Sequence, residues 1–189
     1  MTPARIYLVR HGETTLNADG RCQGQSDSEF TELGRRQIDE LAASLAHVEF
    51  DAAYTSPLDR AARTAEGVLR SRGLRAATVR ELAELSYGRL QGSRFADWPD
   101  DLRTAWHSDP CSVTFPDGES LATLRARVIP VFRAITSAHA GETVLVSAHG
   151  HVNRIILLDV LARPMTDFWA IEQHNGSFTM VDVHAGAAA

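Results

Sequence analysis

The sequence contains no lysine, only two cysteines, and no apolar run as long as a membrane helix needs. A spanning helix takes about 20 consecutive apolar residues, so we expect no membrane contact. Cys22 and Cys111 show no paired metal-binding spacing, and we expect both to be reduced in an intracellular protein. Strand-like sequence is reached by Ile6, which leaves no room for a signal peptide. The prediction is a soluble, cytoplasmic protein.

An excess of positive charge is also missing. The formal net charge of the 189 residues is -5, so the chain has no overall basic field that would hold nucleic acid. Any anion must therefore be bound by a local group of side chains. With 44% hydrophobic residues, the length suits one compact core. We predict a single domain over residues 1–184 and a disordered tail over residues 185–189.

Two predicted strands end in the same dipeptide, histidine followed by glycine. The apolar run over residues 6–9 leads into Arg10 and His11, and the run over residues 144–146 leads into His149. Ligands of open α/β sheets bind outside the carboxyl ends of the strands. We therefore expect these side chains to meet at one edge of a sheet.

A third junction follows the short predicted strand over residues 52–55. Ser56 is suited to cap a helix and Pro57 to occupy its first position, because the missing N–H is not needed there. We expect this helix to run to about Arg72, which places Arg60 near its start. Further elements are expected as a loop at 17–28, helices at 31–46, 95–106, 121–141 and 150–161, strands at 76–79 and 178–183, and a turn-rich segment at 82–92. We expect the helix over 121–141 to be kinked or interrupted by Pro130.

The groups at these three junctions suit a phosphoryl dianion. Arginine forks match phosphate oxygens and stay charged at any working pH. A neutral imidazole can act as a nucleophile, since the unperturbed pKa of histidine is about 6.5. The residue types therefore favour phosphate chemistry over simple charge neutralisation.

In chain order, several motifs resemble those of the histidine phosphatase superfamily, the phosphoglycerate-mutase-like proteins. The resemblance covers nearly the whole chain. The matching segments are Arg10-His11-Gly12-Glu13-Thr14 with Asn17, Gly20-Arg21-Cys22-Gln23-Gly24, Leu33-Gly34, Ser56-Pro57-Leu58-Asp59-Arg60-Ala61, Leu82-Ala83-Glu84 with Gly88, Gly118-Glu119-Ser120, and His149-Gly150.

The resemblance implies an α/β fold, a three-layer α/β/α sandwich with a mostly parallel central sheet. It also implies roles for five catalytic residues. His11 is the expected nucleophile, and Glu84 is the expected proton donor to the leaving oxygen. The phosphoryl group is expected to be held by Arg10, Arg60 and His149.

The same resemblance suggests four substrate-binding residues, namely Asn17, Gln23, Gly24 and Gly150. The expected intermediate is a phosphohistidine, which water hydrolyses or a second acceptor captures. No metal or cofactor is expected, because the arginines supply the positive charge. We interpret His151 as a residue of the pocket wall or one behind it, and Arg63 as a surface residue. The other histidines, at 47, 107, 139, 174 and 184, are expected to be solvated or to pack.

Three functions remain open: a phosphomonoester hydrolase, a cofactor-dependent phosphoglycerate mutase and a non-catalytic module that binds phosphorylated ligands. Leu85 stands where the mutases carry an arginine for the substrate carboxylate, and Arg94 and Arg103 do not match their downstream basic pair. The complete set of catalytic residues favours an enzyme over a binding module. We therefore predict a hydrolase of a small phosphorylated metabolite.

The sequence is compatible with a homodimer. Aromatic residues on the predicted loops are candidates for the pocket wall: Phe95, Trp98, Trp106, Phe115 and Trp169.

Overall fold

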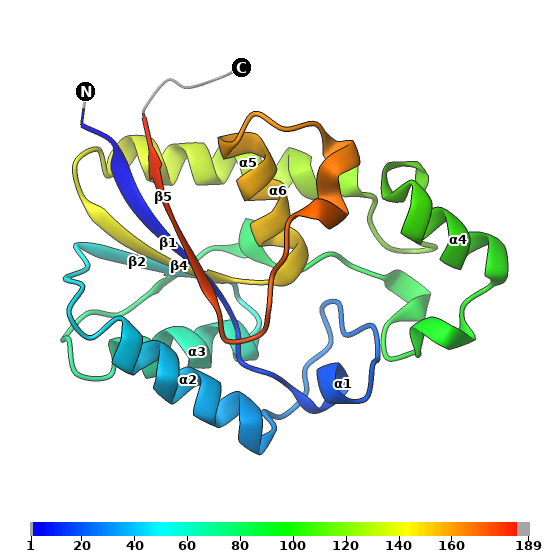
Figure 1. The fold of residues 1–189 in the computed structure, drawn as a ribbon, viewed down its shortest axis with the longest axis horizontal. Coiled ribbons are helices and arrows are strands. Elements are labelled where there is room, and N and C mark those ends of the chain that lie inside the picture. Colours follow the sequence, from blue (N-terminus) through cyan, green and yellow to red (C-terminus); the bar gives the residue numbers. More distant parts are fainter. Residues whose placement is uncertain (1, 185–189) are drawn as a thin grey trace.

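The computed structural model describes residues 2–184, which form a five-stranded sheet between two layers of helices (Figure 1). The strand order is β3-β2-β4-β1-β5, and only β5 runs antiparallel to its neighbour. This arrangement confirms the predicted three-layer α/β fold with a mostly parallel sheet. The strands are β1 (Ala4–Arg10), β2 (Ala52–Thr55), β3 (Ala77–Thr78), β4 (Thr143–Ala148) and β5 (Phe178–Val183).

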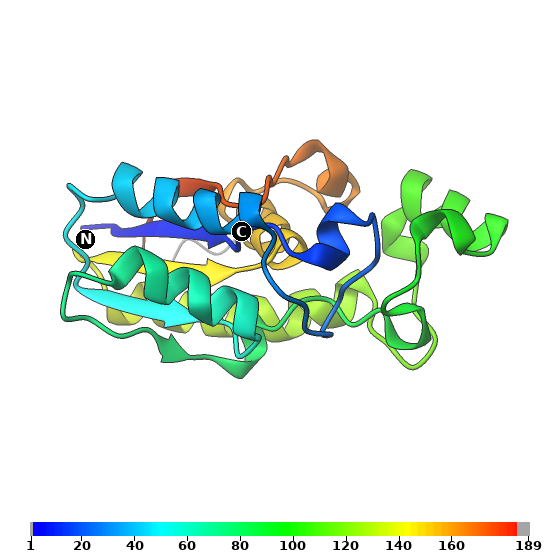
Figure 2. The same cartoon turned by 90° about the horizontal axis from the view of Figure 1, so that it is seen from below.

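Two helix pairs cover the two faces of the sheet. The helices α2 (Glu32–Ser44) and α3 (Asp59–Leu69) pack on one face. The helices α5 (Leu121–Ala138) and α6 (Gly150–Val160) pack on the other. Figure 2, seen from below, shows α2 and α3 lying along the direction of the strands. A strand that is covered on both faces must carry apolar residues on both sides.

The central strand β1 meets this requirement by alternation. Ile6 and Leu8 point into the core under α5 and α6, whereas Val9 joins the core under α2 and α3. All three side chains are fully buried. The apolar run that the sequence shows at this place is therefore a buried strand, and the polar residues after it emerge at its carboxyl end.

The segment after β1 is held against α2 by two glycines in close contact. A Cβ atom on Gly12 would lie 2.5 Å from the Gly34 carbonyl oxygen, and a Cβ atom on Gly34 would lie 2.0 Å from the Glu13 oxygen. Only glycine lets the two backbones approach this closely. The contact fixes the path of the chain just beyond His11.

Smaller elements extend the molecule beyond the carboxyl ends of the strands, at the right of Figure 1. They include the short helix α1 (Thr15–Ala18) and the helix α4 (Asp100–Ser108). Five 3-10 turns complete the connections, at Arg80–Leu82, Gly88–Leu90, Phe95–Asp97, Pro110–Ser112 and Met165–Ala170. No helix within residues 2–184 has both the length and the apolar character needed to cross a bilayer.

Three expectations about helices need correction. The helix after β2 begins at Asp59 and ends at Leu69, not at Pro57 and Arg72, and Ser56 does not cap it. The helix expected at 95–106 is divided into a 3-10 turn and α4, because Pro99 keeps the preceding residue extended. The helix α5 runs through Pro130 without interruption.

The predicted tail at 185–189 lies outside the described residues.

Candidate active site

His11 lies buried at the carboxyl end of β1, with its two ring nitrogens in different environments. Nδ1 lies 2.8 Å from the Gly12 carbonyl oxygen, to which only a protonated nitrogen can donate. Nε2 accepts a hydrogen bond of 3.2 Å from Arg60 Nε. Burial, followed by the charges of Arg60 and Arg10, lowers the pKa of His11 well below its usual value. The imidazole is therefore neutral, with its lone pair on Nε2.

His149 lies beside His11, at the carboxyl end of the neighbouring strand β4. The two ring centroids are 5.2 Å apart. Nε2 of His149 is 2.7 Å from Ser56 Oγ, while its Nδ1 is buried without a hydrogen-bond partner among the described residues. Burial and the charge of Arg60 lower the pKa of His149 well below its usual value. Two neutral imidazoles thus lie side by side at the carboxyl ends of β1 and β4.

Two arginines bring positive charge to the same place. Arg60 is only 2% exposed, and its Nη1 and Nη2 donate to the carbonyl oxygens of Ser26 and Gly24. Burial lowers the pKa of Arg60 to about 10, so the group stays charged at neutral pH. Arg10 donates to the Gln173 carbonyl oxygen, and its buried Nε has no partner within residues 2–184. A buried cation with an unused donor suits an anionic ligand.

Glu84 lies on the turn after the Arg80–Leu82 segment and reaches the first turn of α6. Its Oε1 accepts the Leu85 N–H at 2.9 Å, and its Oε2 lies 3.3 Å from the His151 backbone nitrogen and 3.1 Å from His151 Nδ1. Burial opposes ionisation, but the charge and hydrogen bond of His151 and the Leu85 N–H hold the pKa of Glu84 well below its usual value. Glu84 is a carboxylate in the free protein.

The four predicted substrate-binding residues lie near these groups but differ in what they offer. Asn17 turns its Oδ1 to Thr14 and to Asn175, and none of the described residues accepts from its Nδ2. Gln23 is buried, with both ends of its amide bonded, to Thr14 and to Ser28. Asn17 therefore has a free donor for a ligand, whereas Gln23 holds the loop around it.

The two predicted glycines each lie beside one of the two arginines. Gly24 adopts a φ of +55° and accepts from Arg60 through its carbonyl oxygen. Gly150 begins α6, and a Cβ atom there would lie 3.4 Å from both Cζ and Nε of Arg10. The Gly150 position thus leaves room at the unpartnered Arg10 nitrogen.

A family model described as histidine phosphatase superfamily (branch 1) matches residues 6–189. The chain belongs to this superfamily. It is 30% identical to phosphoserine phosphatase 1 of Hydrogenobacter thermophilus, over 94% of this chain and 85% of the relative. It is 28% identical to the adenosylcobalamin/alpha-ribazole phosphatase of Salmonella typhimurium, over 97% and 93% of the two chains. The solved structure of Bacillus stearothermophilus YhfR superposes with a TM-score of 0.92 at 29% identity, over 98% and 94%.

The turn that carries Glu84 is also bonded to Arg127, a residue that the sequence did not single out. Arg127 of α5 binds both carboxylate oxygens of Glu119, at 2.7 and 2.8 Å, and donates to the backbone oxygens of Ala83 and Glu84. Glu119 in turn accepts the Ser86 N–H. Arg127 and Glu119 therefore clamp the turn that carries Glu84. No sequence pattern separates Arg127 from the other arginines of its helix.

The predicted aromatic wall is largely wrong. Trp98, Trp106 and Phe115 are buried in the core under α4 and contact Tyr87, so they do not face a ligand. Phe95 and Trp169 are exposed. Arg63 lies on the surface as expected, paired with Asp59 and Glu29.

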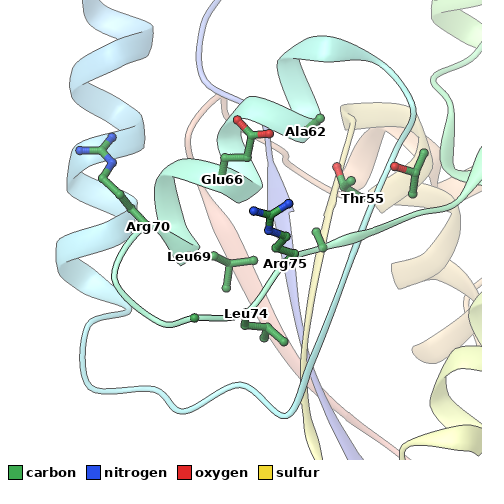
Figure 3. A pocket seen from close by; sticks show the side chains of 10 residues that line it. Thr55, Ala62, Glu66, Leu69, Arg70, Leu74 and Arg75 are labelled. Atoms are coloured by element: carbon green, nitrogen blue, oxygen red, sulfur yellow. The ribbon is translucent and has the colours of Figure 1, made fainter.

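A hollow of about 760 Å³ lies elsewhere, beside α3 and β3 (Figure 3). It is lined by Glu66, Leu74 and Arg75 among others, and none of the predicted site residues takes part. In the described part of this histidine phosphatase, no group of three or more His, Cys, Asp or Glu side chains is arranged to hold a metal ion.

Proposed function

We propose that this protein hydrolyses small phosphomonoesters through a phosphohistidine formed on Nε2 of His11. The observation that carries the proposal is the state of His11: it is neutral, its Nδ1–H is bonded to the Gly12 oxygen, and its Nε2 lone pair lies among buried guanidinium groups. A nucleophile needs that lone pair, and a phosphoryl group needs those cations. Membership of the superfamily supports the same reaction.

In the first step His11 Nε2 attacks phosphorus, the N–P bond forms, and the P–O bond to the leaving alcohol breaks in line with it. Arg10, Arg60 and His149 hold the equatorial oxygens, and Asn17 Nδ2 adds a donor. Glu84 protonates the leaving oxygen. In the second step water attacks phosphorus, an O–P bond forms while the N–P bond to His11 breaks, and Glu84 takes the proton of the water as inorganic phosphate and free His11 are released.

The ionised state of Glu84 in the free protein imposes a condition on this scheme, since a proton donor must carry a proton. A bound phosphomonoester dianion places two negative charges near the carboxylate. Like charges favour the protonated form of a carboxyl group. We infer that substrate binding raises the pKa of Glu84, so that the acid forms only in the complex.

The proposed reaction needs no metal ion, because buried arginines already provide the charge that a metal would add. Exhaustive chelation is accordingly expected to leave phosphate release unchanged. Loss of activity on EDTA treatment, restored by Mg²⁺ or Zn²⁺, would contradict this part of the proposal.

The side chains near Glu84 favour hydrolysis over mutase chemistry. Leu85, at the position where the mutases carry an arginine, is fully buried in the core. Arg103 bonds to Asp100 and to the Ala96 oxygen on the outer side of α4. Neither residue provides a second anchor for a substrate that must turn over within the pocket.

The experiment measures both reactions on one preparation. Phosphate release is followed over a panel of phosphomonoesters that includes phosphoserine and α-ribazole 5′-phosphate, as the names of the relatives suggest. Conversion of 3-phosphoglycerate to 2-phosphoglycerate is followed with a bisphosphoglycerate primer. We expect hydrolysis of the best ester to exceed interconversion by far. Efficient interconversion would identify a mutase, and phosphate release from no ester a binding module.

We also propose that the protein is cytoplasmic. Its proposed partner is a small phosphorylated molecule, and we expect the protein to bind neither nucleic acid nor a membrane. Cys22 and Cys111 are free, which suits a reducing compartment. A homodimer is compatible with the proposal, and sedimentation analysis of the purified protein would test it.

A further inference from the structure

Behind the phosphoryl pocket, three side chains form one hydrogen-bonded row: Glu84, His151 and Tyr87. Glu84 Oε2 lies 3.1 Å from Nδ1 of His151, and the opposite ring nitrogen Nε2 lies 3.2 Å from the Tyr87 hydroxyl. We propose that His151 is a positioning residue that stores the proton Glu84 delivers to the leaving oxygen, with Tyr87 holding its ring. This inference rests on the proposed function and adds the source of the proton.

The donors around Glu84 place the stored proton on the imidazole. The backbone N–H groups of Leu85 and His151 can only donate, and both point at the carboxylate. With His151 Nδ1 as a third donor, both oxygens of Glu84 only accept hydrogen bonds, which is the pattern of an ionised carboxylate. The pair therefore holds its shared proton on Nδ1 until the charge in the pocket changes.

The side chains around His151 shield it and Glu84 from water. Because these neighbours are uncharged, the positive charge of His151 is balanced by Glu84. The His151 side chain is 14% exposed, and its ring stacks on Phe168 at 5.6 Å and 16°. Trp106 of α4 and Trp169 of the Met165–Ala170 turn also contact it, and neither carries a charge.

The charged groups that face the pair are few. Glu84 is the acidic one, and Tyr87 keeps its proton because burial raises its pKa well above the usual value. Arg154 of α6 lies over the Phe168 and Trp169 rings. Across Glu84 lie Arg10, Arg60 and the neutral His11 and His149. A bound phosphoryl dianion would counter the three arginines and draw the proton from His151 towards Glu84.

The proton balance then closes over the two steps. As the P–O bond breaks, a single proton moves: it passes from His151 Nδ1 to Glu84 Oε2 and from Glu84 to the leaving oxygen, so that Glu84 is left as a carboxylate. His151 becomes neutral and keeps its Nε2–H, which donates to the Tyr87 oxygen. The bare Nδ1 lone pair now faces a carboxylate, so the pair is a strong acceptor. When water attacks the phosphohistidine, its proton passes through Glu84 back to Nδ1.

The test is His151→Asn, which keeps an amide donor towards Glu84 but has no proton to release. Phosphoenzyme formation is measured by rapid quench with glycerol 3-phosphate, whose leaving group needs a proton, and with p-nitrophenyl phosphate, whose leaving group does not. General acids contribute about 10²- to 10⁴-fold, so we expect roughly a tenfold to hundredfold loss on the alkyl ester and almost none on the aryl ester. The alkaline limb of the alkyl-ester pH profile should also move to lower pH.

Equal losses on the two esters, or an unchanged ester ratio with an unmoved alkaline limb, would overturn the inference. Tyr87→Phe keeps the buried ring and removes only the hydroxyl. We expect a smaller loss of rate than in His151→Asn, and we again expect the loss to be greater on the alkyl ester than on the aryl ester. This variant carries the test if His151→Asn does not fold, and an unchanged ratio would then be the contradicting result. Failure of the unaltered protein to form a phosphoenzyme from either ester would instead contradict the proposed function.

Discussion

The two sides of the candidate active site are built on different parts of the fold, and their titratable groups differ in charge: the histidines of one side are neutral, and the carboxylate of the other is ionised. The phosphoryl side, with His11, Arg60 and His149, lies at the ends of buried parallel strands and the first turn of α3. The proton side, with Glu84 and His151, joins a turn to the first residues of α6. Both sides are buried, yet burial keeps the histidines of the first neutral while local hydrogen bonds keep the carboxylate of the second ionised. The charge of a buried group in this protein is therefore set by the hydrogen bonds and charges around it, and not by burial alone.

Removing the acid of the proton side should separate the two sides most clearly. Glu84→Gln keeps the size of the side chain but cannot transfer a proton. We expect phosphoenzyme formation from an alkyl phosphomonoester to slow by about 10²- to 10⁴-fold, and formation from p-nitrophenyl phosphate to slow far less. Rapid quench is the measurement, because slow hydrolysis of the phosphohistidine would hide the difference in steady state. Equal losses on both esters would mean that Glu84 only shapes the pocket.

Damage to the phosphoryl side should show no preference among leaving groups. Arg60→Lys keeps a charge but loses the fork that contacts His11 Nε2 and two backbone oxygens. Removing one such donor typically costs about 10²- to 10³-fold in rate, and we expect this loss on alkyl and aryl esters alike. Arg63→Lys, three residues along the same helix and paired with Asp59 on the surface, is the matched control. A loss confined to alkyl esters would place Arg60 on the proton side.

A weaker change to the proton side should act through position alone. Arg127→Met removes the clamp on the turn that carries Glu84 and keeps the apolar stem of the side chain. A misplacement of about 1 Å can cost up to 10²-fold, so we expect a loss of roughly tenfold on alkyl esters and less on p-nitrophenyl phosphate. Arg125→Met is the control on the same helix, since Arg125 is bonded to Asp159 away from the turn. Identical rates in the two variants would show that the clamp has no part in catalysis.

The smallest expected effect concerns the stability of the fold, and it tests whether the two histidines of the phosphoryl side are neutral. The pKa values of His11 and His149 are lowered in the folded protein, so below about pH 6.5 the unfolded chain binds more protons. Stability should therefore fall as the pH falls through that range. Each histidine adds up to about 1.4 kcal/mol per pH unit to the slope.

His11→Asn removes one of these titrating groups, and its slope should be shallower by about that amount. Urea unfolding between about pH 5 and 6.5 measures the free energy of unfolding in both proteins. His47→Asn, at an exposed position, controls for the loss of any histidine. Equal slopes for His11→Asn and the unaltered protein would mean that folding does not lower the pKa of His11.

The sequence predicts the phosphoryl side better than the proton side, for a physical reason. Arg10, His11 and His149 each follow an apolar run within a few residues, so local pattern places them at strand ends. Because β1 and β4 are neighbouring parallel strands, their carboxyl ends lie side by side and bring these residues together. The hydroxyl of Ser56 shows the limit, because it has the right type for a helix cap but is taken by His149, 93 positions away.

The proton side depends almost wholly on contacts between distant segments. Glu84 was predicted from the resemblance, but its ionised state is set by His151, 67 positions along the chain, and its place by Arg127, 43 positions along. In the sequence, the aromatic residues near α4 look like those of a pocket wall. In the structure they form a core instead, because they pack against Tyr87 and His151. Pairings of this kind leave no period or motif in the sequence.

The central claim is that the phosphoryl group passes to His11, and trapping the intermediate tests it most directly. The unaltered protein is mixed with a ³²P-labelled phosphomonoester, quenched within milliseconds, and compared with His11→Ala, whose fold is checked by circular dichroism. We predict label bound to the unaltered protein, stable in base, lost in acid and located at residue 11 by mass spectrometry, and no label in His11→Ala. Label of the same kind in His11→Ala, or label on another residue of the unaltered protein, would contradict the account.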